Sequence, residues 1–200
     1  DQEAVPSRQF DISKIDFELL SREFAHTRRK NLLLRDLDEL VNQQLAKMLF
    51  ANPQRIDYYD RYQEIIDAYN AEQNRATIEK TFMDLMELAS SLDTEQQRYV
   101  REGFSSDEEL SVYDLLFSEN LTKQEIETIK KVSVDLLTKI KQQIAKLDHW
   151  TDKQETKAIV DNLIRNTLWQ ELPNSYDVSD IQTYQKKIYE YVYMRYPEVA

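Results

Sequence analysis

Residues 121–147, with the sequence LTKQEIETIKKVSVDLLTKIKQQIAKL, decide the fold class. Apolar side chains recur along this stretch every three or four residues, which is the spacing of one face of an α-helix. Thr122 and Glu125 form a capping-box signature where the pattern starts. The stretch therefore predicts one amphipathic helix, about 39 Å long at 1.5 Å per residue. Its apolar stripe comprises Ile126, Ile129, Leu136, Ile140, Ile144 and Leu147.

Helical spacing also precedes this stretch. Residues 31–53 carry an apolar stripe that ends at Asn52 and Pro53, because proline cannot continue a helix. Asp57 is the predicted N-cap of the helix that follows. These patterns predict two amphipathic helices joined by a short turn. The stripe of the first comprises Leu34, Leu37, Val41, Leu45 and Met48.

The single glycine of the chain, Gly103, restricts the fold class further. Tight hairpins depend on glycine, so an all-β fold would be hard to build here, whereas a helical bundle would not. Gly103 is instead expected to end a short helix that starts at Thr94. We predict an all-α protein, a single irregular bundle of about seven to nine helices. Residues 1–30 are expected to be a lead-in segment with a short helix, and residues 31–200 the helical domain.

Composition and charge exclude several classes of protein. Without cysteine the chain has no disulfide, thiol nucleophile or cysteine-bound zinc, and it fits a reducing, cytoplasmic location. No run of about 18 apolar residues that could span a membrane is present. The first ten residues, DQEAVPSRQF, lack methionine and the features of a signal peptide, so we expect an excised piece of a longer protein. The net charge of −11 argues against a domain that holds nucleic acid unaided.

His149, one of only two histidines, lies beside Asp148 and raises the question of an active site. A catalytic histidine needs a nucleophile or an orienting acid within reach. Adjacent side chains such as these usually point apart. We therefore interpret His149 as part of the connection between the helix that ends near Leu147 and the next one.

That next helix is predicted from a second capping-box signature. Thr151 and Gln154 have the required spacing, and apolar residues follow at helical intervals as far as Leu168. Trp150 and Trp169, at the two ends of this region, are both predicted to lie in the core.

The sequence gives little support for a phosphate-binding loop, a metal site or a nuclease site. One glycine excludes the GxxxxGK[ST] and GxGxxG phosphate loops. His26 and His149 lie in unrelated contexts and make a poor metal site. Glu155-Thr156-Lys157 matches the end of a nuclease signature, but that signature needs strands, and a helix is predicted here. The prediction is that this chain has no catalytic residue, no metal site and no cofactor.

The segment HTRRKNLLLR, residues 26–35, carries four basic side chains and no acid: Arg28, Arg29, Lys30 and Arg35. Such a cluster can contact the phosphates of nucleic acid, and it can also form a solvated face of a helix. Both interpretations remain open, the first as a weak contact with DNA.

The C-terminal segment YQKKIYEYVYMRY, residues 184–196, interleaves tyrosines with basic residues. Aromatic side chains beside basic ones can stack on bases, whereas tyrosines at helical spacing can pack in a core or dock a subunit. We favour packing or docking. The candidate docking residues are Lys186, Lys187, Tyr193 and Arg195.

Several pieces of the sequence, in their order and spacing, resemble the C-terminal end of the R subunit of type I restriction enzymes. These pieces cover nearly the whole chain, although each alone is a weak helical pattern. They are FDISKIDFELLSREF, KNLLLRDLDELVNQQLAKMLFANPQRIDYYDRYQEIIDAYN, SSDEELSVYDLL, LTKQEIETIKKVSVDLL, LDHWTDKQETKAIVDNLI and IYEYVYMRYP. In that family the R subunit is an ATP-dependent DNA translocase and endonuclease, whose nuclease and motor domains precede this region.

The resemblance implies a helical, noncatalytic domain that attaches the motor to the methyltransferase core. The implied partners are the methyltransferase (M) subunit and the preceding motor domains of the same chain, and ATP and magnesium would belong to the parent subunit. Two alternatives stay open: an accessory domain that contacts DNA, and a helical pocket for a small ligand such as a nucleotide. Docking predicts an exposed apolar patch, DNA contact predicts gathered basic side chains, and a ligand predicts a concave pocket.

Overall fold

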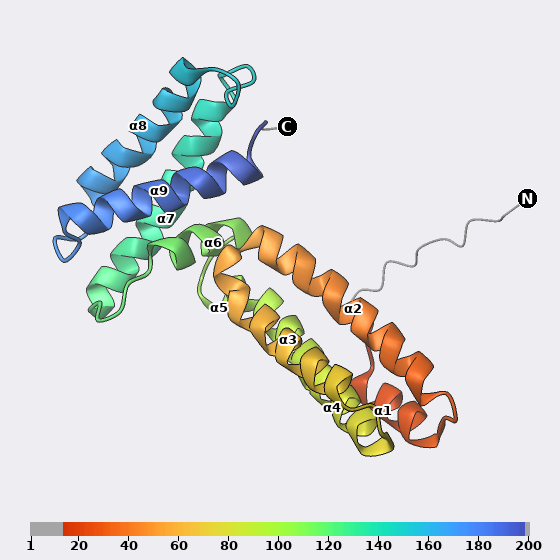
Figure 1. Cartoon of the computed structure of the whole chain (residues 1–200). Coiled ribbons are helices and arrows are strands. Elements are labelled where there is room, and N and C mark those ends of the chain that lie inside the picture. The colour runs from red at the N-terminus through yellow and green to blue at the C-terminus, as the bar shows by residue number, and fades with distance from the viewer. Residues whose placement is uncertain (1–13, 199–200) are drawn as a thin grey trace, which may run out of the picture. The chain divides into compact units, whose positions relative to one another are not determined.

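The computed structural model describes residues 14–198, which are helical almost throughout (Figure 1). Within these residues no strand occurs, so the predicted all-α fold class is confirmed. No described helix is both long enough and apolar enough to cross a membrane. The elements in chain order are α1 (Phe17–His26), α2 (Lys30–Ala51), the 3₁₀ helix η2 (Pro53–Arg55), α3 (Ile56–Ala71), α4 (Arg75–Gln96), α5 (Arg98–Arg101), α6 (Asp107–Leu116), α7 (Lys123–Ile144), α8 (Gln154–Glu171) and α9 (Val178–Arg195).

The chain divides into two compact units, residues 1–98 and 99–200, where a single bundle was expected. The division also falls elsewhere than the expected one at residue 30. Phe24 of α1 stacks on Phe82 of α4 with ring centroids 3.7 Å apart, so the lead-in helix belongs to the first unit. Each unit has its own cluster of buried apolar side chains. Residues 1–13 of the expected lead-in segment lie outside the described residues.

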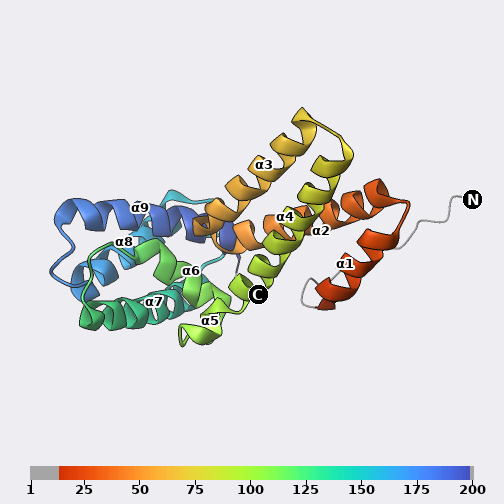
Figure 2. The ribbon, with the colours of Figure 1, turned by 90° about the horizontal axis from the view of Figure 1, so that it is seen from below.

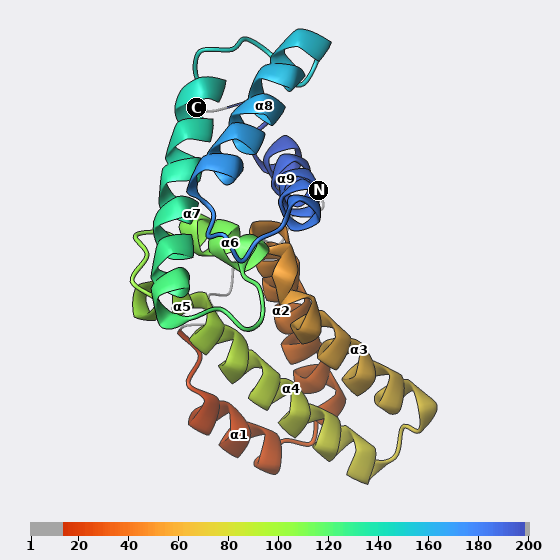
Figure 3. The ribbon, with the colours of Figure 1, turned by 90° about the vertical axis from the view of Figure 1, so that its left-hand side faces the viewer.

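In the first unit, α4 packs against both α2 and α3, and Figure 3 shows these helices running alongside one another. All five predicted stripe residues of α2 are buried. The helix ends as predicted, because Asn52 turns the chain and its Oδ1 accepts the backbone N–H of Gln54 at 3.1 Å, which starts η2 at Pro53.

Two predicted boundaries in this unit are wrong. Asp57 does not cap α3: η2 continues directly into the helix, Arg55 is the N-cap residue, and Asp57 lies in the first turn. No new helix starts at Thr94, because α4 continues to Gln96 and the Thr94 hydroxyl donates to the Ser90 carbonyl one turn earlier. Glu95 lies in this last turn and is buried, so the turn stays packed against the rest of the first unit.

In the second unit, α7 packs against α6 and α8, and α9 packs against α8 (Figure 2). The predicted capping box is confirmed, since Thr122 and Glu125 exchange side-chain and backbone hydrogen bonds. Gly103 has a positive φ of 85° after α5, as expected for a helix stop. α7 ends at Ile144, three residues before the predicted end at Leu147.

The connection between α7 and α8 is built around Trp150. Its side chain is fully buried, as predicted, and its Nε1 donates a hydrogen bond of 2.6 Å to the Tyr196 carbonyl. The predicted capping box at Thr151 and Gln154 is wrong, because α8 begins only at Gln154 and Lys153 occupies the N-cap position without a side-chain cap. We attribute the late start to the burial of Trp150, after which Thr151 and Asp152 still lie in a turn closed by the Asp152 N–H on the His149 carbonyl.

Candidate functional site

The basic segment forms the turn between α1 and α2. The backbone N–H of Arg29 donates to the Thr27 hydroxyl oxygen at 3.0 Å, and α2 starts at the next residue, Lys30. The first turn of α2 contains no acidic side chain. Arg28 and Arg29 are both exposed, and among residues 14–198 neither has a carboxylate partner. These two guanidinium groups are therefore available to an anion.

Lys30 has a different environment from its neighbours. Its Nζ lies 3.1 Å from an oxygen of Glu79 on α4 and 4.6 Å from the centroid of the Phe24 ring. The Nε of Arg75 lies 3.2 Å from the same Glu79 oxygen. Hydrogen bonds from Lys30, and then from Arg75, lower the pKa of Glu79. Glu79 therefore links the N-terminal ends of α2 and α4.

Lys30 and Arg75, but not Glu79 or Phe24, line a hollow of about 610 Å³, called the basic hollow below. Its lining includes Arg28, Arg29, Lys30 and Asn31 from the α1–α2 turn and Arg75 from the start of α4. Three of the four predicted basic residues therefore come together. Arg75 is a fourth that no sequence signal indicated, since it lies 45 residues from Lys30 along the chain.

Arg35 does not belong to the basic hollow. It lies on α2 with its side chain exposed, and its Nη2 is 3.7 Å from the carboxylate of the adjacent Asp36. Five residues make about 1.4 turns of a helix, so Arg35 points roughly 140° away from Lys30 around the helix axis. The structure thus leaves Arg35 on a solvated face, one of the two interpretations that the sequence kept open.

The candidate docking residues of α9 fall into two groups. Lys186 and Tyr193 lie seven residues apart, two helical turns, and therefore share a face. Tyr193 is partly exposed and meets the buried Trp150 edge-on at 5.7 Å between ring centroids. By contrast, Lys187 lies over the Tyr184 ring, and Arg195 is partly buried near the end of the helix.

A second hollow, of about 510 Å³, lies between α8 and α9. Lys157 and Asp161 line it from α8, and Gln185, Lys186 and Tyr189 line it from α9. The Nε2 of Gln185 donates to a carboxylate oxygen of Asp161 at 3.0 Å, which crosses the groove. Charges of both signs and several amides thus line this hollow.

His149 lies on the surface, within the helix connection as interpreted from the sequence. Its Nδ1 is 3.0 Å from a carboxylate oxygen of Glu198. Its Nε2 is 3.5 Å from a carboxylate oxygen of Asp148, so the two adjacent side chains do not point apart as expected. Its backbone has a positive φ of 47°, which turns the chain sharply before Trp150. These contacts tie the end of the described chain to the α7–α8 connection.

The triplet Glu155-Thr156-Lys157 lies in the first turn of α8, as expected. The Thr156 hydroxyl donates to the Trp150 carbonyl at 2.7 Å, a local structural contact. Throughout residues 14–198, no group of three histidine or acidic side chains has an arrangement that would hold a metal ion.

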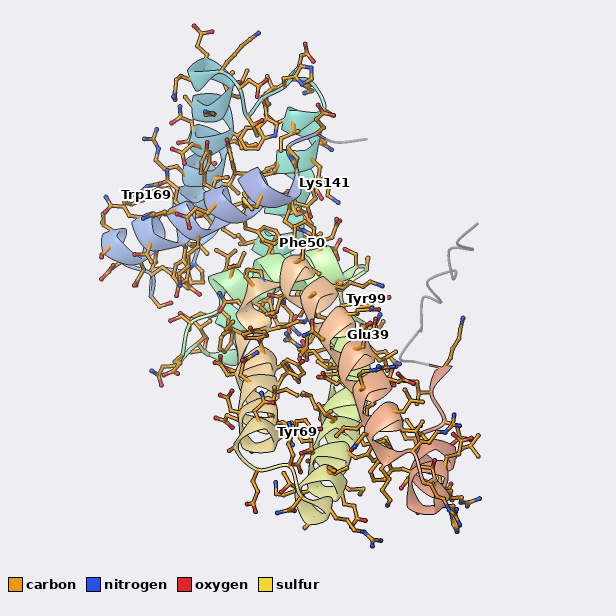
Figure 4. The ribbon with its side chains drawn as sticks, turned by 45° about the vertical axis from the view of Figure 1, so that its right-hand side comes forward. Glu39, Phe50, Tyr69, Tyr99, Lys141 and Trp169 are labelled. Carbon is orange, nitrogen blue, oxygen red and sulfur yellow. The ribbon has the colours of Figure 1, made fainter. Side chains whose placement is uncertain are left out.

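Trp169 contradicts the prediction that it lies in the core. Its side chain is 49% exposed, on the C-terminal part of α8 (Figure 4). The neighbouring Leu168 is fully buried. Successive residues of a helix point about 100° apart, so Leu168 faces the core and Trp169 does not.

Comparison with protein families assigns the chain. A family model described as "Type I restriction enzyme HindI endonuclease subunit-like, C-terminal" matches residues 3–196. The chain belongs to this family. The match confirms the resemblance seen in the sequence, and it covers both units of this HindI-like C-terminal domain. Comparison with curated proteins found no match, and neither did comparison with solved structures.

Proposed function

We propose that this HindI-like C-terminal domain attaches the ATP-dependent translocase and endonuclease of a type I restriction subunit to the methyltransferase core, without taking part in catalysis. The family match supports the setting, a restriction endonuclease subunit. The observation that carries the docking role is Trp169, a large aromatic side chain left half exposed on α8.

Trp169 belongs to a wider set of exposed apolar side chains on the last two helices. Tryptophan, tyrosine and methionine are enriched in protein interfaces, and tryptophan is among the commonest residues that dominate binding energy. Lys186, two turns from Tyr193 on the same face of α9, adds a polar side chain of the kind found at interface rims. The large exposed apolar residues of α8 and α9 are Ile159, Trp169, Val178, Tyr193 and Met194.

The alternative of a small-ligand pocket has less support. Pockets for small ligands are lined mainly by apolar side chains, whereas the hollow between α8 and α9 is lined by lysines, amides and Asp161. Tyr189 is the aromatic residue of its lining. The alternative of contact with DNA concerns a different surface and is treated separately below.

Capture of the 200-residue chain by the immobilised methyltransferase core of its restriction system tests the docking role. We expect Trp169→Ala to weaken binding by about 30-fold, the effect of a typical interface hot spot. Phe50→Ala is the matched control, because Phe50 is an aromatic residue of α2 that is 60% exposed. Trp169→Ala should shift the unfolding midpoint little, since about half of the Trp169 side chain is already in solvent.

Undiminished capture of Trp169→Ala would remove Trp169 from the docking surface and overturn the proposal in this form. Equal losses of binding with Trp169→Ala and Phe50→Ala would indicate nonspecific binding through exposed aromatic side chains. That result would also count against the proposal.

A further inference from the structure

We propose that the basic hollow binds the phosphate backbone of duplex DNA. Four cationic side chains converge there from two segments that are far apart in the chain: Arg28, Arg29 and Lys30 from the α1–α2 turn, and Arg75 from α4. The protein as a whole has 37 acidic and 26 basic residues, so a gathering of four cations runs against its overall charge.

The carboxylate at this site has a structural task. Glu79 accepts hydrogen bonds from Lys30 and Arg75, and it thereby fixes the distance between the starts of α2 and α4. Glu79 contacts only two of the four cations, so the hollow keeps an excess of positive charge. Arg28 and Arg29 supply that excess, because no carboxylate among residues 14–198 pairs with them.

The shape of the hollow suits a phosphodiester backbone. Arg28, Arg29, Asn31 and Leu32 are all exposed, so a long polymer can lie across the site without entering it. Arginine and asparagine side chains are common donors to backbone phosphates, and such contacts carry no sequence information. The lining contains no aromatic ring on which a base could stack. We therefore expect contact with the backbone of a duplex, independent of sequence.

The acidic remainder of the chain limits the affinity. Binding by the free chain should be weak, with a dissociation constant near the non-specific range of about 10⁻⁴ M. Beside other domains that already hold DNA, the same contacts would gain from a high effective concentration. The basic hollow would then add to the affinity of the assembled enzyme for the duplex.

The test is the salt dependence of binding between the complete 200-residue chain and a short fluorescent duplex. Each phosphate contact contributes a slope of about −0.9 in log affinity against log salt. Arg28→Gln with Arg29→Gln removes two contacts. Between about 50 and 200 mM salt, the affinity of the unmodified chain should therefore fall about 12-fold more than that of the double variant. Lys30 and Arg75 stay unchanged because they hold Glu79.

Lys131→Gln with Lys146→Gln is the matched control, since both lysines are exposed in the second unit and the change in net charge is the same. An unchanged slope in the arginine variant overturns the proposal, as does an equal loss of slope in the control. A second arm titrates inorganic phosphate. Phosphate binding that is lost in the arginine variant, with DNA binding unaltered, would make the hollow a site for free phosphate and overturn the assignment to DNA.

This proposal and the docking role fail independently. The basic hollow lies in the first unit, and Trp169 lies in the second. We expect the arginine variant to be captured by the methyltransferase core as well as the unmodified chain.

Discussion

Two tryptophans of this protein have opposite environments. Trp150 is fully buried and donates its indole N–H to the Tyr196 carbonyl, whereas Trp169 is half exposed. The rings of Tyr189 and Tyr193 meet Trp150 edge-on, an arrangement that stabilises aromatic clusters beyond simple burial. Trp150 thus holds the corner between α7 and α8 against the end of α9.

Trp150→Ala should therefore destabilise the second unit by about 3–5 kcal/mol, the usual cost of truncating a buried aromatic side chain. Trp169→Ala, which removes an exposed indole, should change stability little. Urea unfolding of both variants checks the difference. If the two variants unfold at the same urea concentration, Trp150 does not hold the corner as described.

Periodicity in the sequence was sufficient to predict which residues of α2 are buried, because one apolar face of a helix repeats every three to four residues. It could not predict the exposure of Trp169, since the end of a stripe depends on what the neighbouring helix covers. Arg75 was missed for a related reason. Its approach to Lys30 depends on how α4 packs against α2, which no local pattern encodes.

At the scale of elements, the end of α4 contains a buried ionic cluster. Glu95 is buried, and its Oε1 lies 3.0 Å from the Nε of Arg55, which is also buried, and 3.0 Å from the Nε of Arg98. Burial, followed by the charge of Glu95, raises the pKa of the nearby Tyr58. The cluster joins η2, α3 and the last turn of α4.

Glu95→Ala should cost about 3–5 kcal/mol, because it removes a buried carboxylate that bonds both the buried Arg55 and Arg98. Asp84→Ala provides the comparison: Asp84 pairs with Lys80 on the surface of α4, where ion pairs contribute little. Thermal unfolding monitored by circular dichroism distinguishes the two. Similar small shifts for both variants would mean that water reaches the Arg55 site.

Helix boundaries followed local signals in some places and tertiary packing in others. Thr122 and Glu125 start α7 as predicted because both hydrogen bonds of the capping box are local. Thr151 and Gln154 have the same spacing, but the burial of Trp150 sets the path of the chain there. Similarly, Thr94 does not begin a helix because the buried Glu95 keeps α4 intact past it.

At the scale of the whole molecule, two separate cores replace the single bundle expected from the sequence. No proline- or glycine-rich linker marks the division between Arg98 and Tyr99, since α5 spans it as a short helix. A boundary inside a helical segment has no compositional signature. It becomes visible only from which side chains share a core.

We expect the two units to unfold in separate steps. A chain with two cores need not behave as one cooperative system, and probes that report on different units then give different midpoints. Circular dichroism follows helices of both units, whereas tryptophan fluorescence follows the second unit alone, where Trp150 and Trp169 both lie. Coincident midpoints with a single transition in both signals would show that the units unfold together.

The placement of the tryptophans also gives the protein two built-in optical reporters. An indole in a dry core emits at shorter wavelength and is shielded from a soluble quencher such as iodide, while an indole in water emits at longer wavelength and is quenched. The fluorescence of Trp150 would therefore report unfolding of the connection between α7 and α8. The fluorescence of Trp169 would report the binding of a partner to α8. Partner binding would shift the emission to shorter wavelength and unfolding would shift it to longer wavelength, so both could be followed in one unlabelled sample.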